Sequence, residues 1–197
     1  GECLLEFGKG GSIVSLVALV GSLLPFMRAT GFWVLAVPFG MLLISQLSFN
    51  RLRSLYLGSE DTASNPQKWG NRYTLICGIS GGAWGVAGLL WLPGASFAAQ
   101  AIFGVVVAGL CLNTVLSRHV YPNAWLVSTA AAALPGMIAL LLDSNWEAQL
   151  MAALSSLMWI VLYATTKSLY QTSVAAITLQ LENKELVDRL AEAKSEA

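Results

Sequence analysis

Charged residues are scarce in this sequence. Only 11% of its 197 residues are Asp, Glu, Lys or Arg, whereas a soluble domain carries about 25%. Basic and acidic residues number 11 each, so the net charge is zero and no basic surface points to nucleic acid. Hydrophobic residues make up 56% of the chain, and the mean hydropathy is +0.65. This composition excludes a water-soluble globule of this size and predicts an integral membrane protein.

Metal-binding and catalytic side chains are also few. His119 is the single histidine, and the cysteines Cys3, Cys77 and Cys111 form no C-x-x-C pair. A haem or metal site needs several ligands, and a membrane enzyme needs clustered His, Asp, Glu or Cys at membrane depth. We therefore expect no catalytic residue, cofactor or metal. Cys77 and Cys111 lie in apolar runs and are expected to be buried thiols, while His119 and Arg118 are expected to face water or lipid phosphate.

Long apolar runs, by contrast, are abundant. A membrane-crossing helix needs about 20 mostly apolar residues, and six segments approach or meet this length: Gly11–Met27, Phe32–Leu47, Thr74–Leu92, Phe97–Leu116, Tyr121–Leu142 and Ala148–Thr166. The connections are short, apart from a polar stretch over residues 50–72. The sequence predicts an all-α fold in two parts. A bundle of six transmembrane helices covers residues 1–168, and a cytoplasmic coiled-coil signalling helix covers residues 169–197.

The basic residues of the loops set the expected orientation. With six spans both termini lie on one side, and that side holds seven basic residues: Lys9, Arg51, Arg53, Lys68, Arg72, Arg118 and Lys167. The other side holds Arg28 with Asp143 and Glu147. Short cytoplasmic loops carry the excess of Lys and Arg, so both termini are predicted to be cytoplasmic. Aromatic residues near the expected span ends are predicted to lie at the headgroup level: Trp33, Trp69, Trp91, Tyr121 and Trp146.

The end of the chain, from Ala176 onward, has a heptad pattern. Ala176, Asn183 and Leu190 are spaced by seven, as are Leu179 and Leu186 three residues later in each repeat. These are the a and d positions of about three heptads, and a lone Asn at a favours a dimer in fixed register. No Pro or Gly interrupts the chain between the sixth span and this tail, so one continuous helix is predicted. The alternative is an amphipathic helix that lies on the membrane or packs on its own bundle.

A resemblance supports the dimeric interpretation. The tail "LQLENKELVDRLAEAKSEA" resembles the linker that precedes the catalytic part of bacterial sensor histidine kinases and diguanylate cyclases. The segment "GISGGAWGVAGLLWLPG" and the "ALPGM" of residues 133–137 resemble the six-helix sensor domains of such proteins, and more distantly the quorum-sensing receptors of hybrid histidine kinases. The resemblance implies a homodimer in the bacterial inner membrane that acts on a response regulator through an output domain beyond Ala197. No kinase or cyclase motif occurs, so this chain is not expected to be an enzyme.

Two groups of residues are candidates for contact with a signal. Gly81 and Gly85 are four residues apart, so they allow a neighbouring helix to approach closely or form a groove in which Trp84 is an apolar wall. Polar residues within the spans, and the helix-interrupting Pro135, mark function or serve interhelical packing. The predicted ligand-binding residues are Trp84, Gly81, Gly85, Gln100, Asn113, Ser128 and Pro135; the predicted dimerisation residues are Leu179, Asn183, Leu186 and Leu190.

The sequence thus favours a sensory input domain that recognises a small lipophilic signal and passes it through the sixth helix to a dimeric coiled coil. A membrane dimerisation anchor without a ligand is one alternative. A transporter is another, although transporters tend to carry intramembrane charges and paired broken helices, and no charge lies within the third to sixth spans as placed here.

Overall fold

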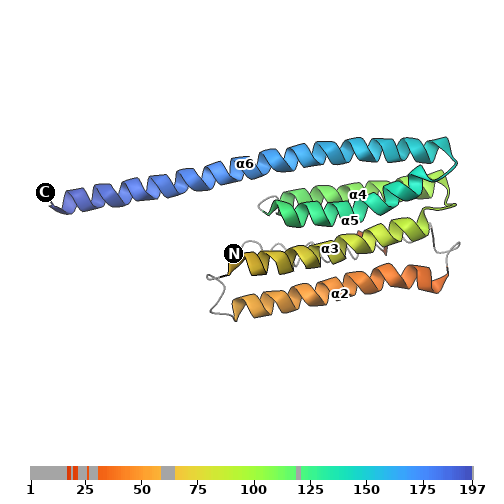
Figure 1. Cartoon of the computed structure of the whole chain (residues 1–197), viewed down its shortest axis with the longest axis horizontal. Helices are drawn as coiled ribbons and strands as arrows, with labels where there is room; N and C mark the ends of the chain where they lie inside the picture. Colours follow the sequence, from red (N-terminus) through yellow and green to blue (C-terminus); the bar gives the residue numbers. More distant parts are fainter. Residues whose placement is uncertain are drawn as a thin grey trace.

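The computed structural model describes residues 31–58, 65–118 and 121–196, together with residues 17, 18, 20, 21 and 26. This part of the chain is all-helical, as predicted (Figure 1). Its helices are α2 (Phe32–Leu57), α3 (Pro66–Trp91), α4 (Phe97–Arg118), α5 (Pro122–Leu141) and α6 (Trp146–Glu196). All five are long and apolar enough to cross a membrane. The first predicted span, Gly11–Met27, falls almost wholly outside the described residues, so the structure shows five of the six spans expected.

Proline and glycine mark where helices start and where the chain turns. Pro66 and Pro122 occupy the first turns of α3 and α5, where a missing N–H costs no intrahelical hydrogen bond. Gly94 has φ +73°, which an L side chain rarely adopts, and it turns the chain between α3 and α4. Two further prolines, Pro38 and Pro135, lie within α2 and α5. The prediction that Pro135 breaks the fifth span is wrong, since α5 continues through it.

The polar stretch between the second and third spans is shorter than the sequence indicated. Residues 50–57 belong to α2, and residues 66–72 belong to α3. Both helices therefore extend past their apolar segments, and the connection shrinks to residues 58–65. A helix needs only backbone hydrogen bonds to continue into water, so hydropathy locates the membrane part of a helix rather than its end.

The helices pack in a defined order. α3 lies along α5, α2 packs on the outer side of α3, and α4 and α6 pack against α5 and each other (Figure 1). The α2–α3 pair and the α4–α5–α6 group thus form two halves that meet where α3 contacts α5. The core contains Trp84, Trp91, Phe103 and Trp125, each at most 3% exposed.

The last helix confirms the predicted continuity. α6 runs without interruption over 51 residues, which corresponds to about 77 Å at 1.5 Å per residue. Its first half lies on the bundle, and its second half projects beyond the ends of the other helices (Figure 1). The tail residues are exposed along the chain described. Pairing of this tail with a second copy in a coiled coil stays a prediction.

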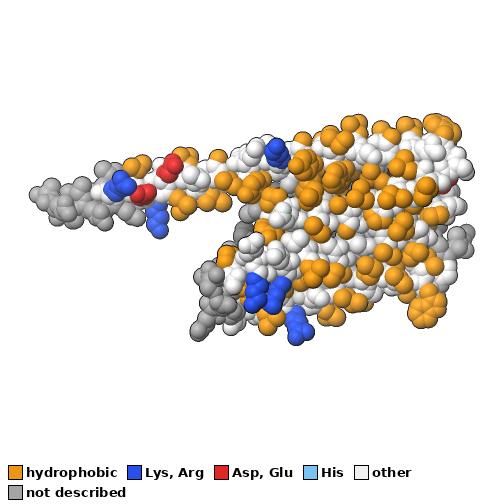
Figure 2. Space-filling model, in the orientation of Figure 1, with side chains coloured by type: hydrophobic (Ala, Val, Ile, Leu, Met, Phe, Trp, Pro, Cys, Tyr) orange, Lys and Arg blue, Asp and Glu red, His pale blue; other side chains and the backbone are white. Residues whose placement is uncertain are grey.

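The two ends of the bundle differ in charge. Basic side chains gather at the end where α2 finishes and α3 begins, whereas hydrophobic side chains are spread over the rest of the bundle on this face (Figure 2). Trp33 and Trp146, at the opposite end, are 77% and 68% exposed; their place at the headgroup level stays a prediction. Trp91, the last residue of α3, is 1% exposed, and its indole N–H donates to the Val34 carbonyl over 3.1 Å, so it packs inside the bundle at a helix end; its place at the headgroup level stays a prediction.

Candidate functional site

The glycine face of α3 is filled by α5. A Cβ at Gly81 would overlap the carbonyl oxygen of Ser128, and one at Gly85 would overlap the carbonyl oxygen of Ala131. At Gly88 a Cβ would lie 2.9 Å from the Cα of Gly136. The backbones of the two helices therefore touch at three positions over about two turns, as small residues permit in membranes. In this structure Gly81 and Gly85 serve close packing, and their contact with a ligand stays a prediction.

Pro135 is part of the same contact. It has no N–H to donate to the carbonyl of Ala131, one turn earlier in α5. That carbonyl points at Gly85, and the Pro135 ring lies 2.8 Å from the Cβ position of the same glycine. A weak Cα–H···O contact from Gly85 can offset part of the missing hydrogen bond. Pro135 thus leaves a carbonyl without a donor at the same point where Gly85 lets α3 approach that carbonyl.

Trp84 lies in the aromatic core and not on an open wall. It is 3% exposed, and its ring centroid is 6.2 Å from that of Phe103. Phe103 also contacts Trp91 at 5.9 Å. Trp84 and Trp91 thus both pack against Phe103, and whether Trp84 contacts a signal stays a prediction.

Gln100 forms a polar cluster at the acidic end of the bundle. Its amide nitrogen donates to the Leu92 carbonyl at 3.2 Å and to Oδ2 of Asp143 at 3.3 Å. The side chain is 2% exposed, and its Oε1 has no hydrogen-bond partner among the described residues. These bonds tie the start of α4 to the connections that follow α3 and α5. Asp143 also accepts from the backbone N–H of Asn145, so the cluster fixes both turns at this end.

Ser128 takes part in a second polar cluster, at the basic end. The Arg118 guanidinium donates to Ser128 Oγ over 2.9 Å, and it also interacts with the Tyr73 hydroxyl and lies near Cys77. Arg118 is half-buried, so it bridges α3, α4 and α5 and does not simply face water as expected. His119 lies outside the described residues. Cys77 and Cys111 are both 2% exposed, which confirms the buried thiols, and Cys3 lies outside the described residues.

The remaining predicted residues do not converge on these clusters. Asn113 is exposed on α4, away from Trp84 and Gln100. Leu179, Asn183 and Leu186 are exposed on the projecting part of α6, whereas the side chain of Leu190 lies outside the described residues. The structure therefore brings Gly81, Gly85, Ser128 and Pro135 together in the α3–α5 contact, and it separates them from Gln100 at one end and Asn113 on the surface.

An aromatic stack between α5 and α6 was not anticipated. Trp125 lies 6.4 Å from Trp159 with ring planes 17° apart, and Trp159 lies 6.3 Å from Tyr163. The indole nitrogens of both tryptophans are buried and have no hydrogen-bond partner among the described residues. The four-residue spacing of Trp159 and Tyr163 places them on one face of a helix. This spacing was the feature of the sequence from which the stack could have been predicted. The stack connects the bundle to the helix that leaves it.

A groove on the bundle surface is a further candidate. It has a volume of about 490 Å³ and lies where α2, α3 and α5 meet, with Met41, Gly78, Gly82 and Val127 in its wall. Its apolar lining ends in Asn71 and Thr74 at the basic end. The groove is open along its length, so a molecule dissolved in the bilayer could enter it sideways. None of the predicted ligand-binding residues lines it.

The glycine contact leads to a first prediction. Gly85→Leu should lower the free energy of unfolding by about 1–3 kcal/mol, because the added side chain meets the Ala131 carbonyl and the Pro135 ring. Gly109→Leu is the matched control, since nothing lies within 4 Å of a Cβ at Gly109; it should change stability by less than about 0.5 kcal/mol. Thermal unfolding of the purified chain in detergent measures both. Equal stability of the two variants would show that α3 and α5 do not touch here.

The buried tryptophans give a second prediction. Trp91 and Trp125 are each 1% exposed, but only Trp91 has a partner for its indole N–H, the carbonyl of Val34. Both substitutions remove part of a buried ring, and Trp91→Phe should cost about 1 kcal/mol more stability than Trp125→Phe, because it also breaks a hydrogen bond whereas Trp125→Phe removes an unsatisfied donor. Chemical denaturation of both variants in the same detergent makes the comparison. A larger loss for Trp125→Phe would mean that its N–H has a partner in the folded protein.

Comparison with known proteins adds no assignment. No family model, no curated protein and no solved structure matches this chain. The resemblance of the tail and of the third span to sensor proteins therefore rests on the quoted residues alone. What the protein does has to be argued from the helices and contacts described above.

Proposed function

We propose that this chain is the transmembrane input module of a bacterial signal-transduction protein of the sensor histidine kinase type, and that it works as a homodimer. The observation that carries the proposal is α6, one uninterrupted helix from Trp146 to Glu196 that joins the apolar bundle to a charged, exposed tail. A rigid helix of this kind can transmit a rotation or a shift from a membrane bundle to a domain beyond it. An anchor with no signal to pass would not need this continuity.

The exposed face of α6 supports self-association. At 3.6 residues per turn, Leu154, Val161, Leu179 and Leu186 fall within about 40° of one another around the helix. Their exposed fractions range from 56% to 59%, so the face is unpartnered both on the bundle and in the tail. The side of α6 that packs on its own bundle, marked by Leu162 at 8% exposure, points about 100° away. A second α6 can therefore lie along this face without meeting the bundle.

Asn183 lies on the same face as these leucines and is exposed. An asparagine at an a position hydrogen-bonds to its counterpart only when two helices are in register, and this favours a parallel dimer. Charged side chains of the tail lie on another face of the helix, where Glu185 and Arg189 pair with each other at the i and i+4 positions. The tail is thus equipped for pairing with its own copy and not for burial on the membrane.

The signal in this proposal is a small lipophilic molecule. The bundle surface is apolar over most of the face shown in Figure 2, and the groove beside α3 opens toward the bilayer. A ligand shifts the equilibrium between two positions of α6 only by the difference between its affinities for the two states. It must therefore contact the bundle in a place that changes when α6 moves. An output domain beyond the tail would pass the change to a response regulator in the cytoplasm.

The alternatives receive less support. A transporter would need polar or charged residues along a path through the bundle, and the two polar clusters described here lie at opposite ends with an aromatic core between them. A membrane anchor without a ligand shares the dimeric tail, and it is distinguished by the absence of any response of the tail to a bound molecule.

Cysteine cross-linking tests the proposed dimer. In a background with the native cysteines replaced by alanine, Leu179→Cys and Leu186→Cys should each give a disulfide-linked dimer on mild oxidation in membranes. Leu181→Cys is the matched control, because Leu181 is 64% exposed but points about 160° away from Leu179 around the helix. It should remain monomeric under the same conditions.

Two outcomes would contradict the proposal. Equal cross-linking at Leu179 and Leu181 would indicate random collision in place of a defined interface. No cross-linking at any of the three positions would indicate that the tail is monomeric. Asn183→Leu provides a further check. Asn183 would be buried in the proposed dimer, so its replacement by leucine should strengthen self-association and also allow oligomers larger than a dimer to form.

A further inference from the structure

The groove beside α3 has the length of one membrane leaflet. It extends along α3 from Asn71 to Gly82, and eleven residues of helix span about 16 Å. The hydrocarbon core of a bilayer is about 30 Å thick, so the groove covers about half of it. Its wall on α3 is apolar from Leu75 to Gly82, with Gly78 and Gly82 forming the floor where a larger side chain would fill it. An extended acyl chain matches this shape.

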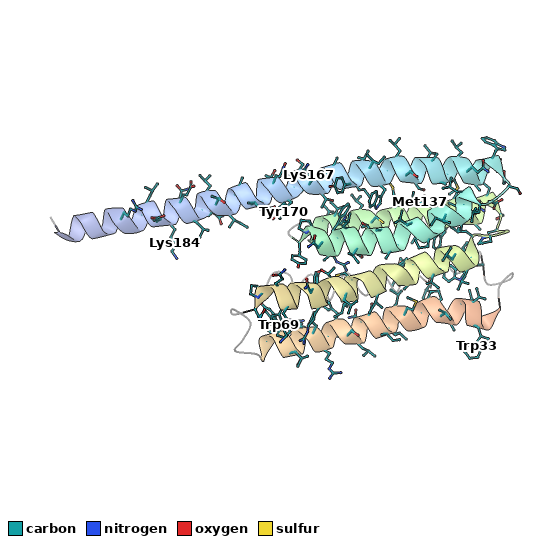
Figure 3. All side chains as sticks on the ribbon, in the orientation of Figure 1. Trp33, Trp69, Met137, Lys167, Tyr170 and Lys184 are labelled. Carbon is teal, nitrogen blue, oxygen red and sulfur yellow. The ribbon has the colours of Figure 1, made fainter. Side chains whose placement is uncertain are left out.

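The polar end of the groove lies at the level of the headgroups. Trp69 contacts Tyr56 at a ring distance of 5.5 Å, and Tyr73 contacts Phe49 at 6.1 Å. Rings of this amphipathic kind prefer the membrane interface, and the labelled Trp69 lies near the start of α3 in Figure 3. These two contacts show how the antiparallel helices α2 and α3 are aligned. The residues of α2 between Phe49 and Tyr56 therefore lie level with the polar end of the groove.

Positive charge surrounds this end. Lys68 lies one turn before Asn71 on the same face of α3, and the Arg72 guanidinium lies over the Trp69 ring at 5.3 Å. Besides Arg118, which contacts Tyr73, the basic residues at this level are Arg51, Arg53, Lys68 and Arg72. Among the described residues none of them has a carboxylate within 4.0 Å; Glu60 and Asp61 of the connecting loop lie outside the described residues. An anionic headgroup would meet a concentrated positive field here, and each basic residue near an anionic surface contributes about 1 kcal/mol to such attraction.

We propose that the groove binds an anionic phospholipid of the leaflet at the basic end, with one acyl chain lying along Gly78 and Gly82 and the headgroup phosphate beside Lys68 and Arg72. The apolar wall recognises the chain, and the basic residues select a negative headgroup over a zwitterionic one. This binding does not depend on the sensory role, because it uses only α2, α3 and Val127 of α5.

Lipid retention by the purified full chain tests the proposal. The chain is reconstituted in nanodiscs that contain equal amounts of phosphatidylglycerol and phosphatidylcholine with the same acyl chains, and is then extracted into mild detergent. The bound lipid is measured by mass spectrometry. The wild type should retain about one phosphatidylglycerol per chain in preference to phosphatidylcholine. In the double variant Lys68→Gln, Arg72→Gln, the ratio of retained phosphatidylglycerol to phosphatidylcholine should fall about fivefold for each charge removed.

Two glycine substitutions test whether the lipid binds in the groove or elsewhere on the protein surface. Gly82→Leu should abolish retention, because the leucine fills the groove; a Cβ at this position lies 3.6 Å from the Met41 methyl group, so the fold accommodates it. Gly109→Leu, on α4 with open space beside it, should retain lipid as the wild type does. Circular dichroism and the unfolding temperature confirm that both variants are folded.

The proposal fails on any of three results. Equal retention of the two phospholipids by the wild type would remove the role of the basic residues. Undiminished retention by folded Gly82→Leu would place the lipid elsewhere. Added palmitate that displaces phosphatidylglycerol at equal concentration would show that the groove takes a free fatty acid rather than a phospholipid.

Discussion

The contact between α3 and α5 is the constraint on which the rest of the bundle depends. In a bilayer the lipid tails are as apolar as the side chains, so helices associate through close packing and backbone contacts and not through exclusion of water. Gly81, Gly85 and Gly88 bring α3 onto the backbone of α5, and this contact joins the α2–α3 pair to the α4–α5–α6 group. A larger residue at any of these positions would separate the two halves and loosen the aromatic core beside them.

The same contact explains why α5 tolerates a proline near its middle. A free carbonyl at membrane depth costs free energy unless another group approaches it. Gly85 lies directly against the carbonyl of Ala131 that Pro135 leaves without a donor. The other end of α5 is held differently: Ser128 accepts from Arg118, and Trp125 stacks on Trp159 of α6. α5 is thus the helix through which α3, α4 and α6 are all connected.

The sequence predicted the helices well and their lateral contacts poorly. Apolar length identifies membrane segments because the bilayer sets their minimum length, and α3 to α6 appear where that argument placed them. It could not place helix ends in water, so the extensions of α2 and α3 were missed. The small-residue spacing of Gly81 and Gly85 indicated a close contact, but spacing alone does not say which helix fills it. Trp91 lay near a span end in the sequence, and only the position of α2, whose Val34 accepts its N–H, shows that it is buried.

The position of the groove relative to α5 gives the bundle a possible route from lipid to tail. Val127 forms part of the groove wall, and its chain neighbours Ser128 and Trp125 contact α4 and α6. An occupant that moved Val127 would therefore act on the same turn of α5 that stacks against the helix leaving the membrane. Adjacent contacts become coupling only when the elements have two arrangements with different affinities for the occupant. In the proposed dimer, α6 would be such an element, because a rotation about its own axis would change which residues two tails present to each other.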